Sequence, residues 1–357
     1  MELLRKDKMP IVNESDIGDQ NLHPVTHHIL NSNPNGIVHN HIGTIFITKN
    51  EWLLHFFEQL ESLIDSTLAR RLAHSSLSYW SKLDYTNWLP KRGFLRGISS
   101  NKMSKSFEKW ANDRTYIGRG MVTPVNWPYS FHIERPLMVS LEVGEICAYL
   151  QHLLGKSLRY QWRDDGGSNA SVTFEELNFP MVENDEINID EGIPSGITLN
   201  IDDGIGWPTR DGLLITIIPT EVFFEFYKTL KEIPIRQMDD PIIESNDLVH
   251  EIDQIICNAS LNACSKEDQK YLIDNYDQLK NWFTNKIESN GYGKLNSATD
   301  FDGDLSINFE AYIPWPIVTG IILDAWQRNN GILGLISINS ITHKNIQISI
   351  KSRREIA

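Results

Sequence analysis

Two stretches of the chain share one pattern of apolar and polar positions. In each, a short β-prone run, at 44–47 and again at 213–218, precedes a helical pattern whose apolar residues recur every three or four positions. The stripe residues are Leu53, Phe56, Phe57, Leu60 and Ile64 in the first stretch, and Phe223, Phe226, Tyr227 and Leu230 in the second. The stripes coincide when Glu51 is aligned with Glu221, and Thr220 is expected to cap the second helix.

A longer internal match lies further along each half. Residues 130–176 align with residues 306–352 without a gap. Each segment reads as an alternating strand, a helix ended by Gly155 or Gly331, and two closing strands. The shared order of elements predicts a tandem duplication. The alternative is two unrelated α+β units with similar patterning, because strand–helix–strand runs are common.

These patterns predict an α+β fold, a tandem duplication of an antiparallel sheet packed against helices. We expect a polar N-terminal arm at 1–42, a first copy at 43–177, an acidic linker at 178–210 and a second, more divergent copy at 211–357. The length of 357 residues fits two domains.

The charge of the chain limits the classes of molecule that it is expected to bind. A net charge of −14 disfavours a nucleic-acid binder, which needs a basic face to neutralise phosphates. Eight bases nevertheless gather in one segment, which we interpret as a solvated loop, with attraction to the acidic linker or to an anionic partner as the alternatives. They are Lys91, Arg92, Arg96, Lys102, Lys105, Lys109, Arg114 and Arg119.

The sequence shows no export or membrane signal. No apolar run reaches the ~18–20 residues that span a bilayer, and no apolar core follows the N-terminal residues, so we expect a cytoplasmic protein. Cys147, Cys257 and Cys264 are too few for a disulfide framework and are expected to be buried thiols.

No metal, cofactor or catalytic group is predicted. Several histidines crowd the N-terminal arm, but no periodic scaffold fixes them as ligands; they are His23, His27, His28, His39 and His41. The acidic run 300–310 is similar to a calcium loop, but Leu305 stands where the glycine should be, so we expect a hairpin turn there. Phosphate-binding loops and nucleophile elbows are absent.

The first copy resembles the 4-vinyl reductase domain family. The segments that carry the resemblance are 43–64, 69–80, 130–134 and 143–162, within residues 43–177; residues 211–351 resemble the family more weakly. This resemblance implies the fold of vesicle-tethering transport-particle subunits and haem nitric-oxide-binding domains. It also implies a ligand sensor, a scaffold or a pigment-pathway accessory, with the two copies forming an intramolecular pseudo-dimer.

The chain departs from that family at its metal site. Sensory members carry zinc-binding cysteines near the closing strands, whereas residues 162–174 contain none. Cys147 resembles a frequent helix cysteine of the family, but alone it cannot build such a site.

By the same resemblance, Trp110, Phe131, Cys147 and Tyr149 lie near the ligand cavity. The matched set in the second copy is Trp282, Ile307, Leu323 and Ala325, with Trp326 beside it. Ordinary core packing is the alternative for both sets. The sharper hypothesis is that copy one binds a small apolar or aromatic molecule and copy two is structural.

The sequence therefore predicts a non-catalytic small-molecule-binding or sensory protein. The alternative is a protein-interaction scaffold, and the third reading is an accessory or enzyme of tetrapyrrole reduction. No output module is recognisable, so a sensor would signal through a protein partner.

Overall fold

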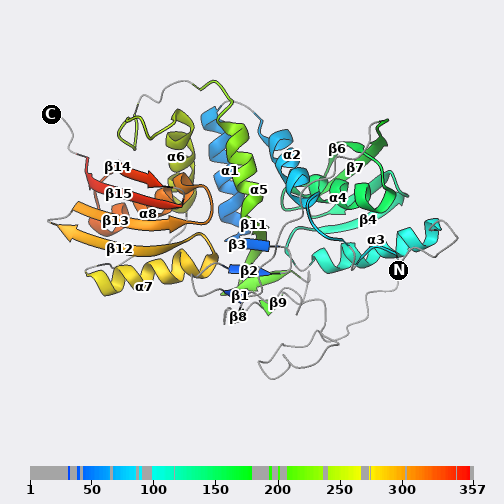
Figure 1. Cartoon of the computed structure of the whole chain (residues 1–357), viewed down its shortest axis with the longest axis horizontal. Coiled ribbons are helices and arrows are strands. Elements are labelled where there is room, and N and C mark those ends of the chain that lie inside the picture. Colours follow the sequence, from blue (N-terminus) through cyan, green and yellow to red (C-terminus); the bar gives the residue numbers. More distant parts are fainter. Residues whose placement is uncertain are drawn as a thin grey trace.

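The protein folds as two similar halves on either side of a shared central sheet (Figure 1). The computed structural model describes residues 31–32, 38–40, 43–64, 67–85, 88–90, 99–115, 117–178, 193–194, 200–201, 207–235, 240–266, 273, 275–301, 304–342 and 344–353.

The central sheet joins the two copies. Its seven strands run in the order β8-β1-β2-β3-β11-β10-β9. Their bounds are β1 Asn31–Ser32, β2 Val38–Asn40, β3 Gly43–Lys49, β8 Ile193–Pro194, β9 Asn200–Ile201, β10 Pro208–Arg210 and β11 Leu213–Pro219. Ile47 pairs with Ile217 across the antiparallel β3–β11 contact. These residues are equivalent when Glu51 is aligned with Glu221, so an approximate two-fold axis passes between them.

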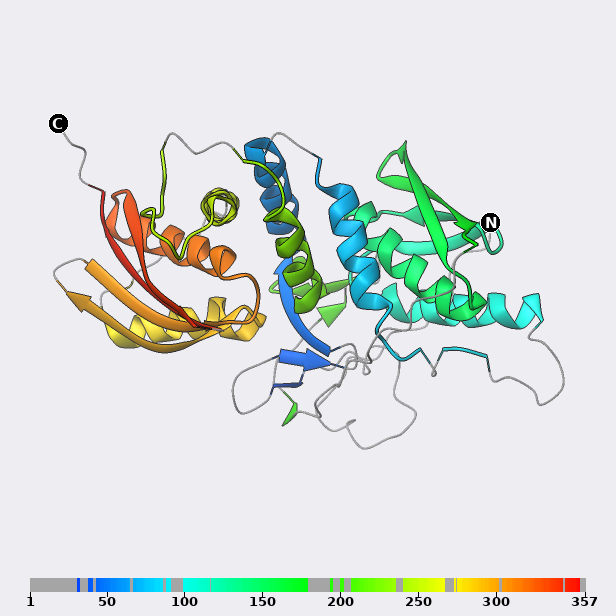
Figure 2. The same cartoon turned by 45° about the horizontal axis from the view of Figure 1, so that its top comes forward.

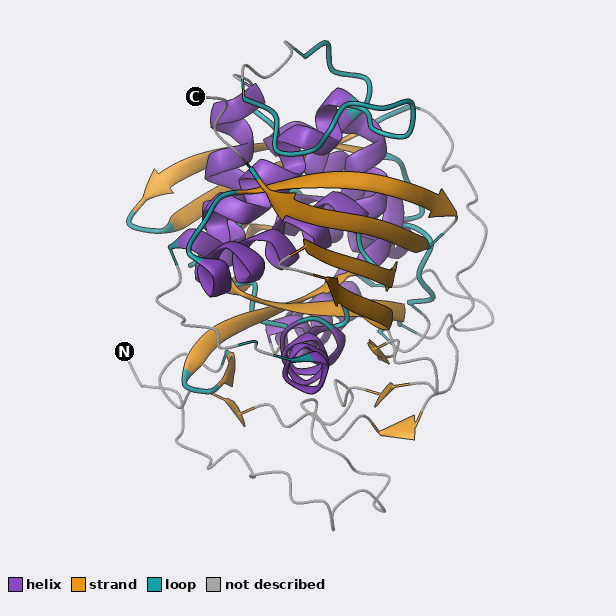
Figure 3. Cartoon of the chain, turned by 90° about the vertical axis from the view of Figure 1, so that its left-hand side faces the viewer, coloured by secondary structure: helices purple, strands orange, loops and turns teal. Residues whose placement is uncertain are grey.

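Each copy also has a four-stranded antiparallel sheet. The orders are β4-β5-β7-β6 and β12-β13-β15-β14. The strands of copy one are β4 Met121–Asn126, β5 Ser130–Glu134, β6 Leu158–Gly166 and β7 Asn169–Glu176. Those of copy two are β12 Gly293–Phe301, β13 Asp304–Ala311, β14 Gly334–Thr342 and β15 Asn345–Ser352. Figure 3 shows the sheet of copy two crossing in front of the helices.

Helices fill the space between the sheets. In copy one they are α1 Asn50–Ile64, α2 Ala69–Trp80, α3 Ser100–Thr115 and α4 Val139–Leu154. In copy two they are α5 Thr220–Leu230, α6 Glu251–Ser265, α7 Tyr276–Lys286, the short 3-10 turn η3 Glu288–Asn290 and α8 Trp315–Asn330.

The first helix of each copy packs against the other copy. α1 lies against α6, and α5 lies against α2. The indole Nε1 of Trp52 donates to Sγ of Cys264 at 3.2 Å, and Arg71 Nη1 donates to the carbonyl of Thr229 at 2.8 Å. At the centre, α1 and α5 run side by side in Figures 1 and 2, and the ring of Phe57 lies 5.5 Å from that of Phe226. The stripes predicted from the sequence therefore face one another across the two-fold axis.

The gap-free alignment of the two copies is confirmed element by element. The bounds of α4, β6 and β7 map residue for residue onto those of α8, β14 and β15. Gly155 and Gly331 both end their helices in the left-handed region, with φ of 68° and 67°. β12 ends at Phe301 and pairs with β13 from Asp304, which confirms the hairpin expected at the acidic run.

A second pair of glycines brings helices into close contact. A Cβ on Gly144 would lie 2.4 Å from the carbonyl oxygen of Ala73, and one on Gly320 would lie 2.4 Å from that of Cys257. Beside each contact a buried serine hydroxyl spans the helices: Ser76 donates to Leu141 at 2.8 Å, and Ser260 to Ile317 at 2.7 Å. The same pair of interactions, a close glycine contact and a serine hydrogen bond, therefore holds α4 against α2 and α8 against α6.

Two local predictions are wrong. Thr220 does not cap α5: Pro219 is the N-cap residue, and the Thr220 hydroxyl donates to the carbonyl of Thr44 at 3.4 Å. The basic segment is not a solvated loop where the structure describes it. Residues 100–115 form α3, and Arg114 and Arg119 are 3% and 0% exposed.

Strands also occur within the predicted arm and linker. β1 and β2 lie in residues 1–42, and β8, β9 and β10 lie in residues 178–210, all in the central sheet. The β-prone residues 197–201 predict one strand in the linker, and β9 lies within them. Hydrogen bonding to the central sheet, rather than an apolar period, places the other four, so the hydrophobic pattern carries no sign of those.

Replacing Gly144 or Gly320 with alanine is expected to lower the free energy of unfolding by ~1–3 kcal/mol, because the added methyl group meets backbone atoms. Urea denaturation of the two variants measures this. Helix propensity alone predicts the opposite sign, since alanine favours a helix interior by ~0.5–1 kcal/mol over glycine. A stabilised variant would show that the helices separate at little cost.

Candidate functional site

The four predicted ligand residues lie in the core of copy one. Trp110, Phe131, Cys147 and Tyr149 are all buried. The rings of Trp110 and Tyr149 stack in parallel at 4.4 Å between centroids. The Cys147 sulfur instead faces β6, 3.7 Å from the carbonyl oxygen of Leu158. Burial raises the pKa of this thiol to about 12, which keeps it protonated and unreactive.

Phe107 connects these rings and was missed by the sequence prediction. Its centroid lies 4.8 Å from that of Phe131 and 5.4 Å from that of Trp110. Trp127 adds a further ring 5.3 Å away. Phe107 and Trp110 are three residues apart, a spacing that puts both side chains on one face of a helix and could have identified Phe107. The lysines and polar residues around them obscure this apolar pattern. The rings occupy the space between the predicted residues, whose ligand role stays a prediction.

The equivalent place in copy two contains a pocket. Alignment of α4 with α8 puts Ala325 where copy one has Tyr149, and alignment of Trp110 with Trp282 puts Leu279 where copy one has Phe107. Two aromatic rings are thereby replaced by smaller side chains. A cavity of about 90 Å³ results, and it is lined by Leu279, Trp282 and Ala325 among others. A cavity that holds one water molecule needs a volume of only ~10–15 Å³.

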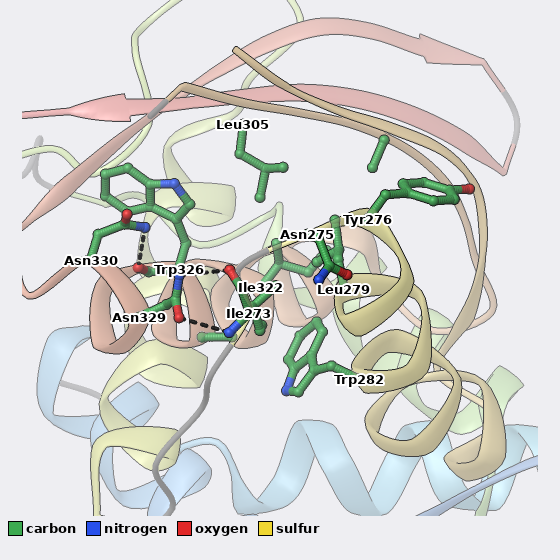
Figure 4. A pocket seen from close by; sticks show the side chains of 12 residues that line it. Ile273, Asn275, Tyr276, Leu279, Trp282, Leu305, Ile322, Trp326, Asn329 and Asn330 are labelled. Atoms are coloured by element: carbon green, nitrogen blue, oxygen red, sulfur yellow. Dashed lines mark hydrogen bonds between the residues drawn. The ribbon is translucent and has the colours of Figure 1, made fainter. Parts of the chain in front are cut away.

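The pocket lies between α7 and α8, beneath the strands of copy two (Figure 4). Ile322 and Trp326 on α8 complete its apolar wall, and Leu305 at the start of β13 lies above them. Tyr276, 48% exposed, stands at the edge of the pocket. The walls are therefore mostly apolar and include three aromatic rings, as in many small-molecule sites.

The position of the Trp326 ring depends on a matching change in β14, where Gly334 stands in place of a leucine of copy one. A Cβ on Gly334 would lie 2.8 Å from the Trp326 ring, so only glycine fits there. In copy one the equivalent residues are Leu150 and Leu158, two side chains of equal size. The exchange of two leucines for tryptophan and glycine puts an indole into the pocket wall.

Asparagines form the polar end of the pocket. Asn329 holds the chain at Ile273 in both directions, donating to its carbonyl at 3.0 Å and accepting from its amide at 2.9 Å. Asn275 Oδ1 caps α7 by accepting from Gln278 at 3.0 Å, and Asn330 Nδ2 donates to the Trp326 carbonyl at 2.8 Å. Among the described residues, Asn275 Nδ2 and Asn330 Oδ1 make no hydrogen bond. One donor and one acceptor are thus present beside an apolar cavity.

Copy one also buries a cluster of charges. Arg114 contacts both Glu142 and Glu145, and its bonds to Glu145 measure 3.2 and 3.0 Å. Arg119 donates to Glu145 at 2.9 Å and to the carbonyl of Ile217 on β11 at 3.1 Å. All four side chains are at most 3% exposed. Each arginine thus lies beside a carboxyl group, as burial of a charge requires.

Burial alters the ionisation of this cluster. It raises the pKa of Glu142 to about 7, although Arg114 and Arg119 oppose the shift. Within the described residues, the second carboxyl oxygen of Glu142 has no hydrogen-bond partner. The cluster links α3 and α4 to the central sheet, and we interpret it as a structural support of copy one rather than a reaction centre.

The described part of the chain shows neither a metal-binding cluster nor a membrane-spanning helix. It holds no group of three His, Cys, Asp or Glu side chains placed to bind a metal ion. Of the arm histidines, only His39 lies within the described residues; His23, His27, His28 and His41 lie outside them. No helix described is long and apolar enough to cross a bilayer. All three cysteines are buried free thiols, as expected.

Comparison with protein-family models, with curated proteins and with solved structures finds no match for this chain.

The pKa of Glu142 predicts a pH-dependent stability. Its ordinary pKa is 4.5, so between pH 4.5 and about 7 the folded protein holds a proton that the unfolded chain has lost. This contribution is complete below pH 4.5 and is lost as pH rises through about 7. Glu142→Gln removes it, so the stability of the wild type should fall relative to the variant by up to ~3 kcal/mol over this range.

Urea denaturation at several pH values between 4.5 and 8 measures this difference. Glu134→Gln, at an exposed position, is the matched control and should leave the pH profile unchanged. A wild-type-minus-variant difference that stays constant with pH would show that Glu142 remains ionised in the folded protein.

Proposed function

We propose that this protein is a non-catalytic binding protein, an intramolecular pseudo-dimer that holds a small apolar or aromatic molecule in the pocket of copy two. The observation that carries the proposal is the cavity left where Ala325 and Leu279 replace the rings of Tyr149 and Phe107. A large-to-small change in a core normally costs stability through the cavity that it leaves. A bound ligand offsets that cost.

The lining chemistry indicates the class of ligand. Trp282 and Trp326 offer large faces for a flat apolar body. Asn275 and Asn330 offer one amide hydrogen and one carbonyl oxygen at the rim. A flat molecule with a single polar group satisfies both features: a phenol hydroxyl can donate and accept, and an indole N–H can donate to Asn330 Oδ1.

The same lining favours binding over catalysis. Of the described residues that line the pocket, none is Asp, Glu, His, Lys, Arg or Cys, and Tyr276 is the one ionisable group among them. General acid–base and covalent catalysis need such groups within hydrogen-bonding reach of the substrate. The reading as a tetrapyrrole-reducing enzyme therefore gains no support from this site.

The scaffold alternative has less to support it. Exposed large apolar side chains in the described residues are separated along the chain, and only Ile332 and Leu333 are consecutive. Single exposed apolar residues are normal on a protein surface and do not mark an interface.

Ala325→Tyr tests the proposal by restoring the ring of copy one. Indole is the probe, and its saturable binding to the full chain is measured by ligand-observed NMR. We expect the variant to bind indole at least roughly tenfold more weakly, since the ring fills the cavity. Tyr149→Phe in copy one is the matched control and should bind as the wild type does.

Leu279→Phe is a second filling variant in case Ala325→Tyr folds poorly, which circular dichroism would reveal. Indole affinities equal to the wild type in the folded variants would remove copy two as the site. Weaker binding in Tyr149→Phe alone would place the ligand in copy one, as the sequence predicts.

A further inference from the structure

A second pocket lies where the two copies meet. Its cavity volume is about 150 Å³. Copy one contributes Lys49 from the end of β3 and Trp52 from α1, and copy two contributes Lys286, Tyr292 and Ile321. Arg210 comes from β10, at the end of the linker. No single copy could form it, and it shares no lining residue with the pocket between α7 and α8.

The charge around this pocket is positive. Among the described residues that line it, three are basic, Lys49, Arg210 and Lys286, and one is acidic, Asp211. The guanidinium of Arg210 is held by neutral oxygens: Asn290 Oδ1 at 2.9 Å, Ser289 Oγ at 3.1 Å and the Ser289 carbonyl at 3.4 Å. These bonds orient the guanidinium without neutralising its charge, and a planar guanidinium suits a carboxylate or phosphate.

Copy one shows what occupies the equivalent place. There Glu145 puts a carboxylate between Arg114 and Arg119, at 3.0 and 2.9 Å. The alignment of the copies maps Glu145 onto Ile321 and Glu142 onto Val318. Copy two has therefore lost both acids.

The cationic side of that arrangement is partly kept. The helix alignment that pairs Trp110 with Trp282 maps Arg114 onto Lys286, and the paired glycines beside them map Arg119 onto Tyr292. Lys286, Tyr292 and Ile321 all line the pocket. The free volume thus lies among the counterparts of the residues that surround the Glu145 carboxylate.

The geometry points to an oxyanion site at this junction, where the carboxylate or phosphate group of a small ligand takes the position that the Glu145 side chain holds in copy one. The guanidinium of Arg210, held only by neutral oxygens in the described residues, supplies the positive charge, and Lys49 and Lys286 line the same pocket. Trp52 and Tyr292, both nearly buried, give the ligand an aromatic wall to lie against. Because residues of both copies form the site, the ligand bridges them and stabilises the tandem arrangement.

Ile321→Glu is the sharpest test, because it returns the missing carboxylate to the protein itself. The probes are benzoate, its neutral analogue benzamide, and inorganic phosphate, each titrated into the full chain at low ionic strength by calorimetry. We expect saturable binding of benzoate or phosphate that weakens with added salt, and much weaker binding of benzamide. Ile321→Glu should abolish it, whereas the matched neutral variant Ile321→Gln should retain it.

Arg210→Gln provides a test at a less buried position, where misfolding is a smaller risk. Loss of the guanidinium should weaken anion binding by roughly tenfold or more. Binding of benzoate but not phosphate, or the reverse, identifies which oxyanion the site takes.

Two results would overturn the proposal. One is the absence of saturable binding of either anion to the wild type up to about 10 mM, which is weaker than an Arg–oxyanion contact in a pocket should be. The other is unchanged affinity in both folded variants, Ile321→Glu and Arg210→Gln. Neither result bears on indole binding between α7 and α8, which is measured separately.

Discussion

The antiparallel pairing of β3 with β11 is the contact on which the rest of the structure depends. It places Ile47 opposite its own counterpart, Ile217, and so sets the two-fold relation of the copies. From each strand the chain runs directly into a central helix, α1 or α5, which packs on the other copy. A copy alone would expose this strand edge together with the apolar faces of α1 and α2, or of α5 and α6. The two copies therefore form one folding unit with a continuous core.

Within this symmetric frame the two copies have diverged at matched positions. Copy one fills its interior with stacked rings and with a buried cluster of two arginines and two glutamates. Copy two keeps the backbone of the same elements but carries smaller or uncharged side chains at those points. Ala325 opens one pocket and Ile321 lines another. Copy one thus shows which side chains are missing at each of the two pockets.

The stacked rings and the buried ion cluster stabilise copy one by different interactions. In a buried ion cluster each charge is compensated by a neighbour of opposite sign, so removal of one member leaves an uncompensated charge. Ring stacking is held by contact area and shape. A ligand that takes the place of the rings must therefore be apolar, and one that takes the place of Glu145 must be anionic. The proposed functions follow from this complementarity, with copy two as the binding half and copy one as the support.

The sequence by itself determined the duplication, because the apolar period and the helix-ending glycines at 155 and 331 are local properties that survive divergence. It also identified Trp110, Tyr149 and their counterparts as matched positions. Only the tertiary structure decided which copy holds a cavity, because Ala325 is an ordinary small core residue until Trp282 is seen opposite it. The burial of Arg114 and Arg119 could not be predicted either, since their partners lie on another helix and hydrophobic period carries no information about ion pairs between elements. The exchange of α1 and α5 between copies was likewise decided in space, since a stripe shows that a helix face is buried but not against which neighbour.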